Sequence, residues 1–299
     1  MNIIGKKNIY FAISLIVIIP GLIALFLWHL NLGIDFTGGS RITLSFPHTA
    51  DQQTIDQVNR AVAKQGVKVG TIQTSDKLIL IRTSPMEQRQ NNQFVQSVQA
   101  SSPGAKEESF ETIGPTIGAE TTLNAVKGIL LASILIILFI AWSFRQVPKP
   151  ASSIRFGVCA ILALVHDVLV VVGIFAILGH FFHVEVDSLF VTAILTVIGF
   201  SVHDTIVVFD RIRENLRRMG GASFSQIVNE SILQTLDRSL NTSLTVLLVL
   251  LALLLFGGES IRWFVVALLV GVISGTYSSI FNASPLLVLW HEWSLKRKT

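Results

Sequence analysis

An acidic side chain inside an apolar run is the feature of this sequence with the clearest chemical potential. Asp204 follows His203 within residues 198–209, which are otherwise almost entirely apolar. An ionised carboxylate at the centre of a bilayer costs about 2.5 to 3.5 kcal/mol, so it must face other helices, pair with a partner or carry a proton. Each arrangement makes Asp204 a candidate for exchanging protons. Histidine titrates near pH ~6.5, so His203 either shares a proton with Asp204 or stays neutral and bonds a backbone carbonyl.

The same dipeptide occurs once more in the preceding apolar segment, where Asp167 follows His166. Polar side chains in membranes commonly form hydrogen bonds between helices, each contributing about 0.6 kcal/mol. Ionisable residues in membrane helices also mark proton pathways. The sequence leaves both roles open for this pair, and one of the two aspartates could serve only to position the other.

Small and polar residues recur every four positions in the last apolar segment. One stripe of these residues allows close contact between helices. The other forms a polar seam. The start of the fifth segment adds a second polar face. Either packing or a proton path explains these residues. The close-contact stripe is Gly271, Gly275 and Ser279, and the polar seam comprises Ser274, Ser278 and Asn282 with Arg238, Asn241 and Thr245.

The composition places these residues in a membrane protein. Hydrophobic residues make up 51% of the 299 residues and charged residues 14%, whereas soluble domains average about 25% charged residues. Crossing about 30 Å of hydrocarbon takes roughly 20 residues, and six segments are apolar enough to do so. They cover residues 9–28, 126–144, 156–178, 189–209, 242–256 and 263–290.

Basic residues predict the orientation. They gather at the N-terminus, after the second and fourth segments and in the C-terminal tail, so both termini are expected in the cytoplasm. This pattern explains the net charge of +4 without a nucleic-acid partner. The basic stretch 211–218 suits anionic lipid, ion pairs along a helix or a cytoplasmic partner.

The segment 31–122 has the composition of a water-soluble domain and is expected outside the cytoplasm. Its pattern predicts strands at 41–46, 67–72, 78–83 and 109–113, with helices at 51–65 and 86–99 and a turn at 74–77. The order β-α-β-β-α-β favours a ferredoxin-like α+β sheet. We therefore predict a first span in residues 1–30, this extracytoplasmic domain, and five further spans with a cytoplasmic tail in 123–299.

Glycines flank the predicted outer domain on both sides. The first set is Gly33, Asp35, Gly38 and Gly39, and the second is Gly114 with Pro115. Glycine permits positive φ and close backbone approach. These junctions are either hinges that pass movement to the outer domain or ordinary tight connections.

Soluble-enzyme chemistry has no support in the sequence. No phosphate-binding loop, zinc-protease or hydrolase motif occurs, and Cys159 is the single cysteine. We therefore expect no enzyme activity, no cofactor, no metal centre and no intramolecular disulfide.

Five motifs together resemble the SecF family, the protein-export membrane subunits of the bacterial Sec system, which are related to the resistance-nodulation-division transporters. The resemblance covers nearly the whole chain. The motifs are GIDFTGG at 33–39, VHD at 165–167, SVHDTIVVFDRIREN at 201–215, RSLNTS at 238–243 and GTYSSIF at 275–281.

The resemblance implies a subunit in the bacterial inner membrane that pairs with SecD beside the SecYEG channel, with YajC and YidC as further partners. Such subunits use proton motive force to assist the late translocation of preproteins. Asp204 matches the family's intramembrane aspartate, but His203 stands where the family usually has asparagine. The coupling ion, H⁺ or Na⁺, stays open. The alternatives are an assembly scaffold that couples nothing and a small-molecule exporter of the wider superfamily.

Overall fold

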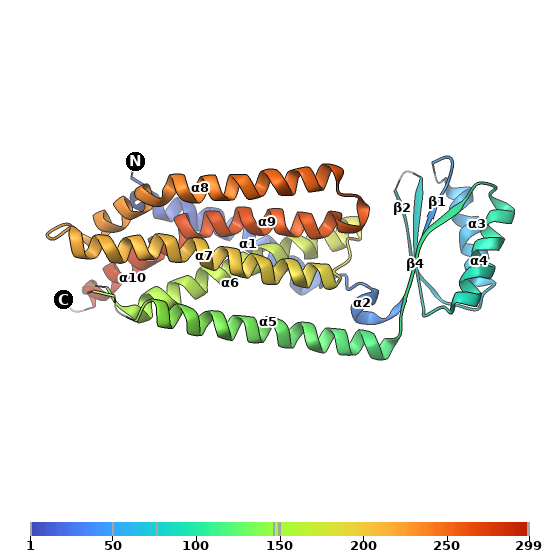
Figure 1. Ribbon diagram of the computed structural model, residues 1–299, viewed down its shortest axis with the longest axis horizontal. Coiled ribbons are helices and arrows are strands. Elements are labelled where there is room, and N and C mark those ends of the chain that lie inside the picture. The colour runs from blue at the N-terminus through green and yellow to red at the C-terminus, as the bar shows by residue number, and fades with distance from the viewer. Residues whose placement is uncertain (1, 50, 76, 146, 149–150, 298–299) are drawn as a thin grey trace. The chain divides into compact units, whose positions relative to one another are not determined.

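Two compact units make up the protein in this computed structural model, which describes residues 2–49, 51–75, 77–145, 147–148 and 151–297. One unit comprises Met1–Asn31 with Lys127–Thr299, and the other comprises Leu32–Val126. The second unit is a few residues longer at its C-terminal end than the predicted domain 31–122. The structure confirms the predicted fold class: apolar helices of membrane-spanning length, plus one small α+β domain (Figure 1).

Six helices in the described part of the chain are long and apolar enough to span a membrane. The last span is interrupted by a π-helical turn at Ser279–Ala283. The helices are α1 (Lys7–Trp28, after a 3-10 turn at Ile4–Lys6), α5 (Pro115–Ser143), α6 (Ser153–Phe182), α7 (Ser188–Arg218), α8 (Phe224–Phe256), α9 (Arg262–Ser278, after a 3-10 turn at Glu259–Ile261) and α10 (Ser284–Lys296).

Two of these helices begin well before the apolar segments that predict them. α5 begins at Pro115 rather than near residue 126, because proline is favoured in the first turn of a helix, where its missing N–H is not needed. α8 begins at Phe224 rather than near residue 242, because Ser223 and Gln226 form a reciprocal capping box there. Hydrophobicity marks the part of a helix that lies in lipid and not the part that extends into water.

α7 extends beyond the predicted end at residue 209 because ion pairs stabilise its polar turns. Asp210 pairs with Arg213, and Glu214 pairs with Arg211 at 2.5 Å and with Arg218 at 2.8 Å. Such pairs, three or four residues apart, each add about 0.2 to 0.5 kcal/mol. The basic stretch 211–218 therefore continues α7. This is the arrangement expected if its residues form ion pairs along a helix.

Proline explains the π-helical turn between α9 and α10. Pro285 lies in the first turn of α10 and cannot donate the helical hydrogen bond to the carbonyl of Phe281. Ser284 instead donates its hydroxyl to the Ser279 carbonyl at 3.3 Å. A π-turn holds more residues than an α-turn and changes the direction in which later side chains point.

Glycine allows α1 and α6 to pack with their backbones in contact. A Cβ atom on Gly21 would lie 2.9 Å from the Cα of Gly173, and one on Gly173 would lie 2.7 Å from the Cα of Gly21. Small residues at such crossings let membrane helices approach closely. This crossing fixes α1 against the rest of the helical unit.

The second unit has the predicted β-α-β-β-α-β order. Its antiparallel sheet has the strand order β2-β3-β1-β4, which is the ferredoxin-like arrangement. The predicted turn at 74–77 includes Asp76, which lies outside the described residues. The elements are a short α2 (Ile34–Thr37), β1 (Gly39–Ser45), α3 (Gln52–Ala63), β2 (Val69–Ser75), β3 (Leu78–Thr83), α4 (Gln88–Ser101) and β4 (Lys106–Ile113).

The core of this unit lies between the sheet and its two longer helices, which cover one face of the sheet (Figure 1). Alternate residues of the central strands, such as Ile42 and Ile81, are fully buried, as are Val58 of α3 and Phe94 of α4. The period of two along the strands and the amphipathic helices therefore supply one continuous core.

We predict that Gly21→Ala destabilises the helical unit by about 1 to 3 kcal/mol, because overpacking a tight contact costs this much. Thermal unfolding of the purified protein in detergent, followed by intrinsic fluorescence, would measure the change. Gly199→Ala in α7 is the matched control, since a Cβ atom there meets nothing within 4 Å. Equal unfolding temperatures for Gly21→Ala and Gly199→Ala would contradict the proposed backbone contact.

Candidate functional site

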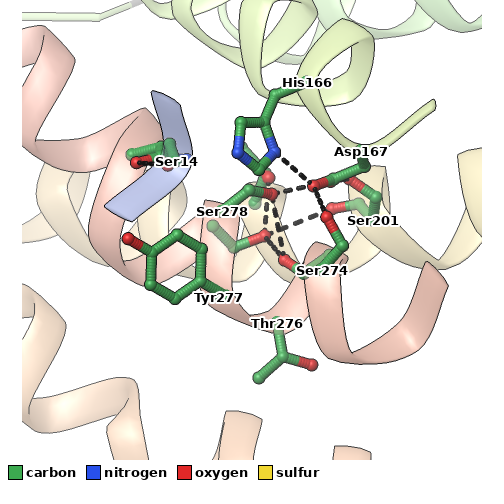
Figure 2. A network of polar contacts seen from close by, with 12 residues as sticks. Ser14, His166, Asp167, Ser201, Ser274, Thr276, Tyr277 and Ser278 are labelled. Carbon is green, nitrogen blue, oxygen red and sulfur yellow. Dashed lines mark hydrogen bonds and ion pairs between the residues drawn. The ribbon is translucent and has the colours of Figure 1, made fainter. Parts of the chain in front are cut away.

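Asp167 of α6 is the centre of a buried polar cluster (Figure 2). Its side chain is 1% exposed. One carboxylate oxygen, Oδ2, accepts hydrogen bonds from Ser201 at 2.5 Å and Ser278 at 2.6 Å. The other, Oδ1, accepts from Ser274 at 2.7 Å and lies 2.9 Å from Nδ1 of His166. Residues of α6, α7 and α9 thus meet at one carboxylate, which we call the Asp167 cluster.

Two glycines of α9 bring these residues together. A methyl group on Gly271 would collide with the side chain of Val197 in α7. One on Gly275 would lie 3.2 Å from the Cβ of Ser201 and 3.7 Å from Oδ2 of Asp167. α9 therefore lies close enough to α7 for the short serine side chains to reach the carboxylate.

His166 connects the cluster to the neighbourhood of α1. Its ring is stacked on Tyr277 with centroids 6.4 Å apart, and the Tyr277 hydroxyl donates to the Tyr10 carbonyl of α1 at 2.7 Å. Nε2 of His166 is buried without a hydrogen-bond partner. His166 and Asp167, which are adjacent in the sequence, are thus in direct contact in the structure.

Asp204 of α7 lies in a different environment. The residue is 6% exposed, and Oδ1 accepts a hydrogen bond from Ser239 of α8 at 2.7 Å. Its second oxygen, Oδ2, is buried with no hydrogen-bond partner. The preceding residue, His203, is exposed.

Three further pairs of buried polar side chains form hydrogen bonds that join the last span to α7, α8 and α1. Ser201, Asp204 and Thr205 lie three and four residues apart on one face of α7, so this face borders both carboxyl groups. The three bonds join Thr205 to Ser279 at 2.8 Å, Ser243 to Thr276 at 2.5 Å and Asn282 to Ser14 at 2.8 Å.

The structure brings together only part of the predicted polar seam. Ser274 and Ser278 bind Asp167, as described above. Asn282 instead contacts Ser14 of α1, because it follows the start of the π-turn. Arg238, Asn241 and Thr245 are all exposed along α8 and lie outside the buried clusters.

Ser239 and Ser243 of α8 face the interior. They are not among the residues predicted to form the polar seam. They continue a series in which Ser231 and Thr235 are also buried. The four-residue spacing of small hydroxyl residues was the available signal, since it marks one helical face. Arg238 is a stronger polar signal than Ser239 and lies about 100° from it around the helix. The polar face predicted from Arg238 and Asn241 is therefore a different face of α8.

The predicted junction residues all lie within the second unit, where Gly33 is the N-cap of α2 and Asp35 lies in its first turn. Gly38 and Gly39 have φ of 69° and 132°, values that favour glycine. A Cβ atom on Gly38 would lie 2.9 Å from the Cα of Pro115. The segments leading into β1 and away from β4 are thus packed backbone against backbone, with Gly114 beside them in open space.

No group of three or more His, Cys, Asp or Glu side chains that could hold a metal ion occurs among the described residues. Two buried carboxyl groups, those of Asp167 and Asp204, lie in the described part of the helical unit. The first is contacted by three serine hydroxyls and the ring of His166, and the second has an oxygen without a hydrogen-bond partner.

Comparisons with known proteins match this arrangement. The family described as "Protein export membrane protein SecD/SecF, C-terminal" matches residues 93–293, and the "SecD/SecF GG Motif" matches residues 24–46. A protein translocase subunit SecF of Thermobaculum terrenum is 48% identical over 98% of this chain and 94% of its own length. Another, of Anaerolinea thermophila, is 43% identical over 98% and 96%.

Among solved structures, the crystal structure of SecDF, a translocon-associated membrane protein from Thermus thermophilus, aligns with a TM-score of 0.85 at 34% identity. The alignment covers 98% of this chain and 39% of that one. The chain thus spans about two fifths of the length of that relative.

We predict that Ser278→Ala destabilises the helical unit by about 1.5 to 3 kcal/mol, the usual contribution of a hydrogen bond to a charged group. The unfolding midpoint in detergent would measure this loss. In an Asp167→Asn background the same substitution should cost much less, because the two changes remove one shared interaction.

The matched control for this cycle is Ser294→Ala. Ser294 bonds only the carbonyl of His291, one turn away, so its loss should change stability little. Additive effects of Ser278→Ala and Asp167→Asn would show that the serine does not act through the carboxylate.

Proposed function

We propose that this chain, which belongs to the SecD/SecF family of protein export membrane proteins, uses proton motive force to assist preprotein translocation through the SecYEG channel. In this proposal it is not an enzyme but an ion-coupled subunit. Asp204 is the group that takes up and releases the proton. The observation that carries the proposal is its buried Oδ2, which has no hydrogen-bond partner.

The contrast between the two aspartates supports the choice of Asp204. Both oxygens of Asp167 are occupied, each by serine hydroxyl donors and one of them also by the ring of His166. At Asp204 a proton can bind Oδ2 while Ser239 keeps its bond to Oδ1. We infer that Asp167 holds α6, α7 and α9 together and that Asp204 responds to the proton.

The membrane potential supplies enough energy for this role. A proton that crosses about 150 mV releases roughly 3.5 kcal/mol. That amount shifts a two-state equilibrium by more than about a hundredfold. In our proposal the two states differ in the packing of α7 against α8, whose contact includes the bond between Asp204 and Ser239.

The orientation in this proposal follows the positive-inside rule. Lys6, Lys7 and the basic end of α7 then lie in the cytoplasm with both termini, and the α+β unit lies outside. The glycine junction around Gly38 and Pro115 would carry movement of α1 and α5 to the sheet through its backbone contacts. Junctions of this kind transmit a change when they are too tightly packed to absorb it.

Partners follow from the comparisons and from the exposed apolar surface. SecDF, of which this chain spans 39%, implies a second chain corresponding to SecD. Within this chain, only 6% of the residues in the most apolar stretch of α5 are buried, and 17% of those in the most apolar stretch of α8. We propose that SecD covers part of this surface and lipid the rest, and that SecYEG, YajC and YidC complete the assembly in the inner membrane.

We predict that Asp204→Asn leaves the protein folded and assembled but abolishes the stimulation of export by membrane potential. Asparagine keeps an acceptor for Ser239 and cannot be protonated at neutral pH. The measurement is preprotein uptake into proteoliposomes that contain the chain with its SecD partner and the channel, with and without an imposed potential.

Asp210→Asn is the matched control for this experiment. It removes a carboxylate from the same helix, but from an exposed position paired with Arg213, so potential-driven export should persist. If Asp204→Asn also retained full stimulation, the coupling role would be wrong and the chain would act as an assembly scaffold.

A further inference from the structure

A cavity of about 260 Å³ lies where α5 ends, and nothing in the proposed coupling mechanism uses it. Its lining residues are Trp142, Ser143, Arg145 and Arg213. Three of them come from the last turn of α5 and the residues just after it, and the fourth comes from the polar extension of α7. The cavity therefore lies at an end of the membrane-spanning region.

Three packed aromatic rings hold this end of α5 against α6 and α7. Phe144 packs on Phe156 of α6 with ring centroids 5.5 Å apart and on Phe209 of α7 at 5.7 Å. Phe156 and Phe209 are themselves 5.0 Å apart, and all three side chains are buried. Because α5 is otherwise little buried, these rings hold the cavity in place at this point.

The cavity presents positive charge in a defined geometry. The guanidinium group of Arg145 lies 4.7 Å from the centre of the Trp142 ring and donates to the Trp142 carbonyl at 3.1 Å. Arg213 donates to the Ser143 carbonyl at 3.4 Å and pairs with Asp210. Two guanidinium groups and one carboxylate leave the site with a net positive charge.

Guanidinium groups suit phosphate because their planar set of N–H donors matches two oxygens at once. Each arginine here uses only some of its donors in the contacts described above. Tryptophan is enriched where a bilayer passes from hydrocarbon to headgroups, and Trp142 is 62% exposed at the end of the apolar α5. The surface of α5 next to it carries exposed Leu135 and Leu138, which can lie against acyl chains.

We propose that this cavity binds a phosphate group, and that the phosphate is the headgroup of an anionic phospholipid. The two arginines hold the phosphate, Trp142 orients Arg145, and the acyl chains extend along α5. The bound lipid joins the end of α5 to α7.

Retention of individual lipids by the purified full-length chain in neutral detergent, measured by native mass spectrometry, would test this site. Phosphatidylglycerol should bind in preference to phosphatidylcholine. Arg145→Ala should weaken phosphatidylglycerol binding at least about tenfold, the effect expected from the loss of a hydrogen bond between charged groups. Arg213→Gln should do the same.

Arg218→Ala is the matched control. It removes one positive charge and one exposed ion pair from the same end of α7, but Arg218 does not line the cavity, so binding should change less than about twofold. Arg145→Lys retains the charge without the planar donors, and it should recover less than half of the loss seen in Arg145→Ala.

Three results would overturn the proposal. Arg218→Ala could weaken binding as much as Arg145→Ala, which would indicate general charge attraction. Phosphatidylcholine could bind as well as phosphatidylglycerol. Inorganic phosphate at millimolar concentration could displace the lipid completely, which would show that the cavity takes free phosphate rather than a headgroup.

Discussion

The buried carboxylate of Asp167 is the constraint on which the rest of the helical unit depends. A charged group removed from water is tolerated only when donors replace its hydration. Here the donors come from α7 and α9, and the ring of His166 contacts the carboxylate from its own helix. These helices cannot separate without leaving the carboxylate unsatisfied, so the cluster requires α6, α7 and α9 to move as one body.

The need of the Asp167 carboxylate for hydrogen-bond donors explains the positions of the small residues in α9. A serine hydroxyl is short, so it reaches a carboxylate on another helix only when the two backbones are close. Gly271 and Gly275 provide that closeness on α9, and Ser274 and Ser278 on the same helix provide the donors. The two glycines of one stripe and the two serines of the other thus serve a single purpose at Asp167, and neither pair would be useful there without the other.

The sequence predicts the features of this fold that depend on the thickness of the bilayer and on the regular spacing of apolar residues. Six spans follow from the thickness of the bilayer, and the β-α-β-β-α-β unit follows from strand alternation and helical spacing in residues 39–113. The interior face of α8 does not follow, because successive residues are about 100° apart and Arg238 is a stronger polar signal than Ser239. The π-turn was also unpredicted, since only the packing around Pro285 selects it over a kink.

The energies involved decide which carboxyl group can respond to a proton. About 3.5 kcal/mol is available from a potential of about 150 mV, and a hydrogen bond to a charged group contributes about 1.5 to 3 kcal/mol. One proton can therefore offset the loss of roughly one or two such bonds. Dismantling the Asp167 cluster would require the loss of more, whereas the contact between Asp204 and Ser239 is a single bond. In the proposed mechanism the proton therefore acts at this one bond between α7 and α8, while the contacts around Asp167 keep α6, α7 and α9 joined.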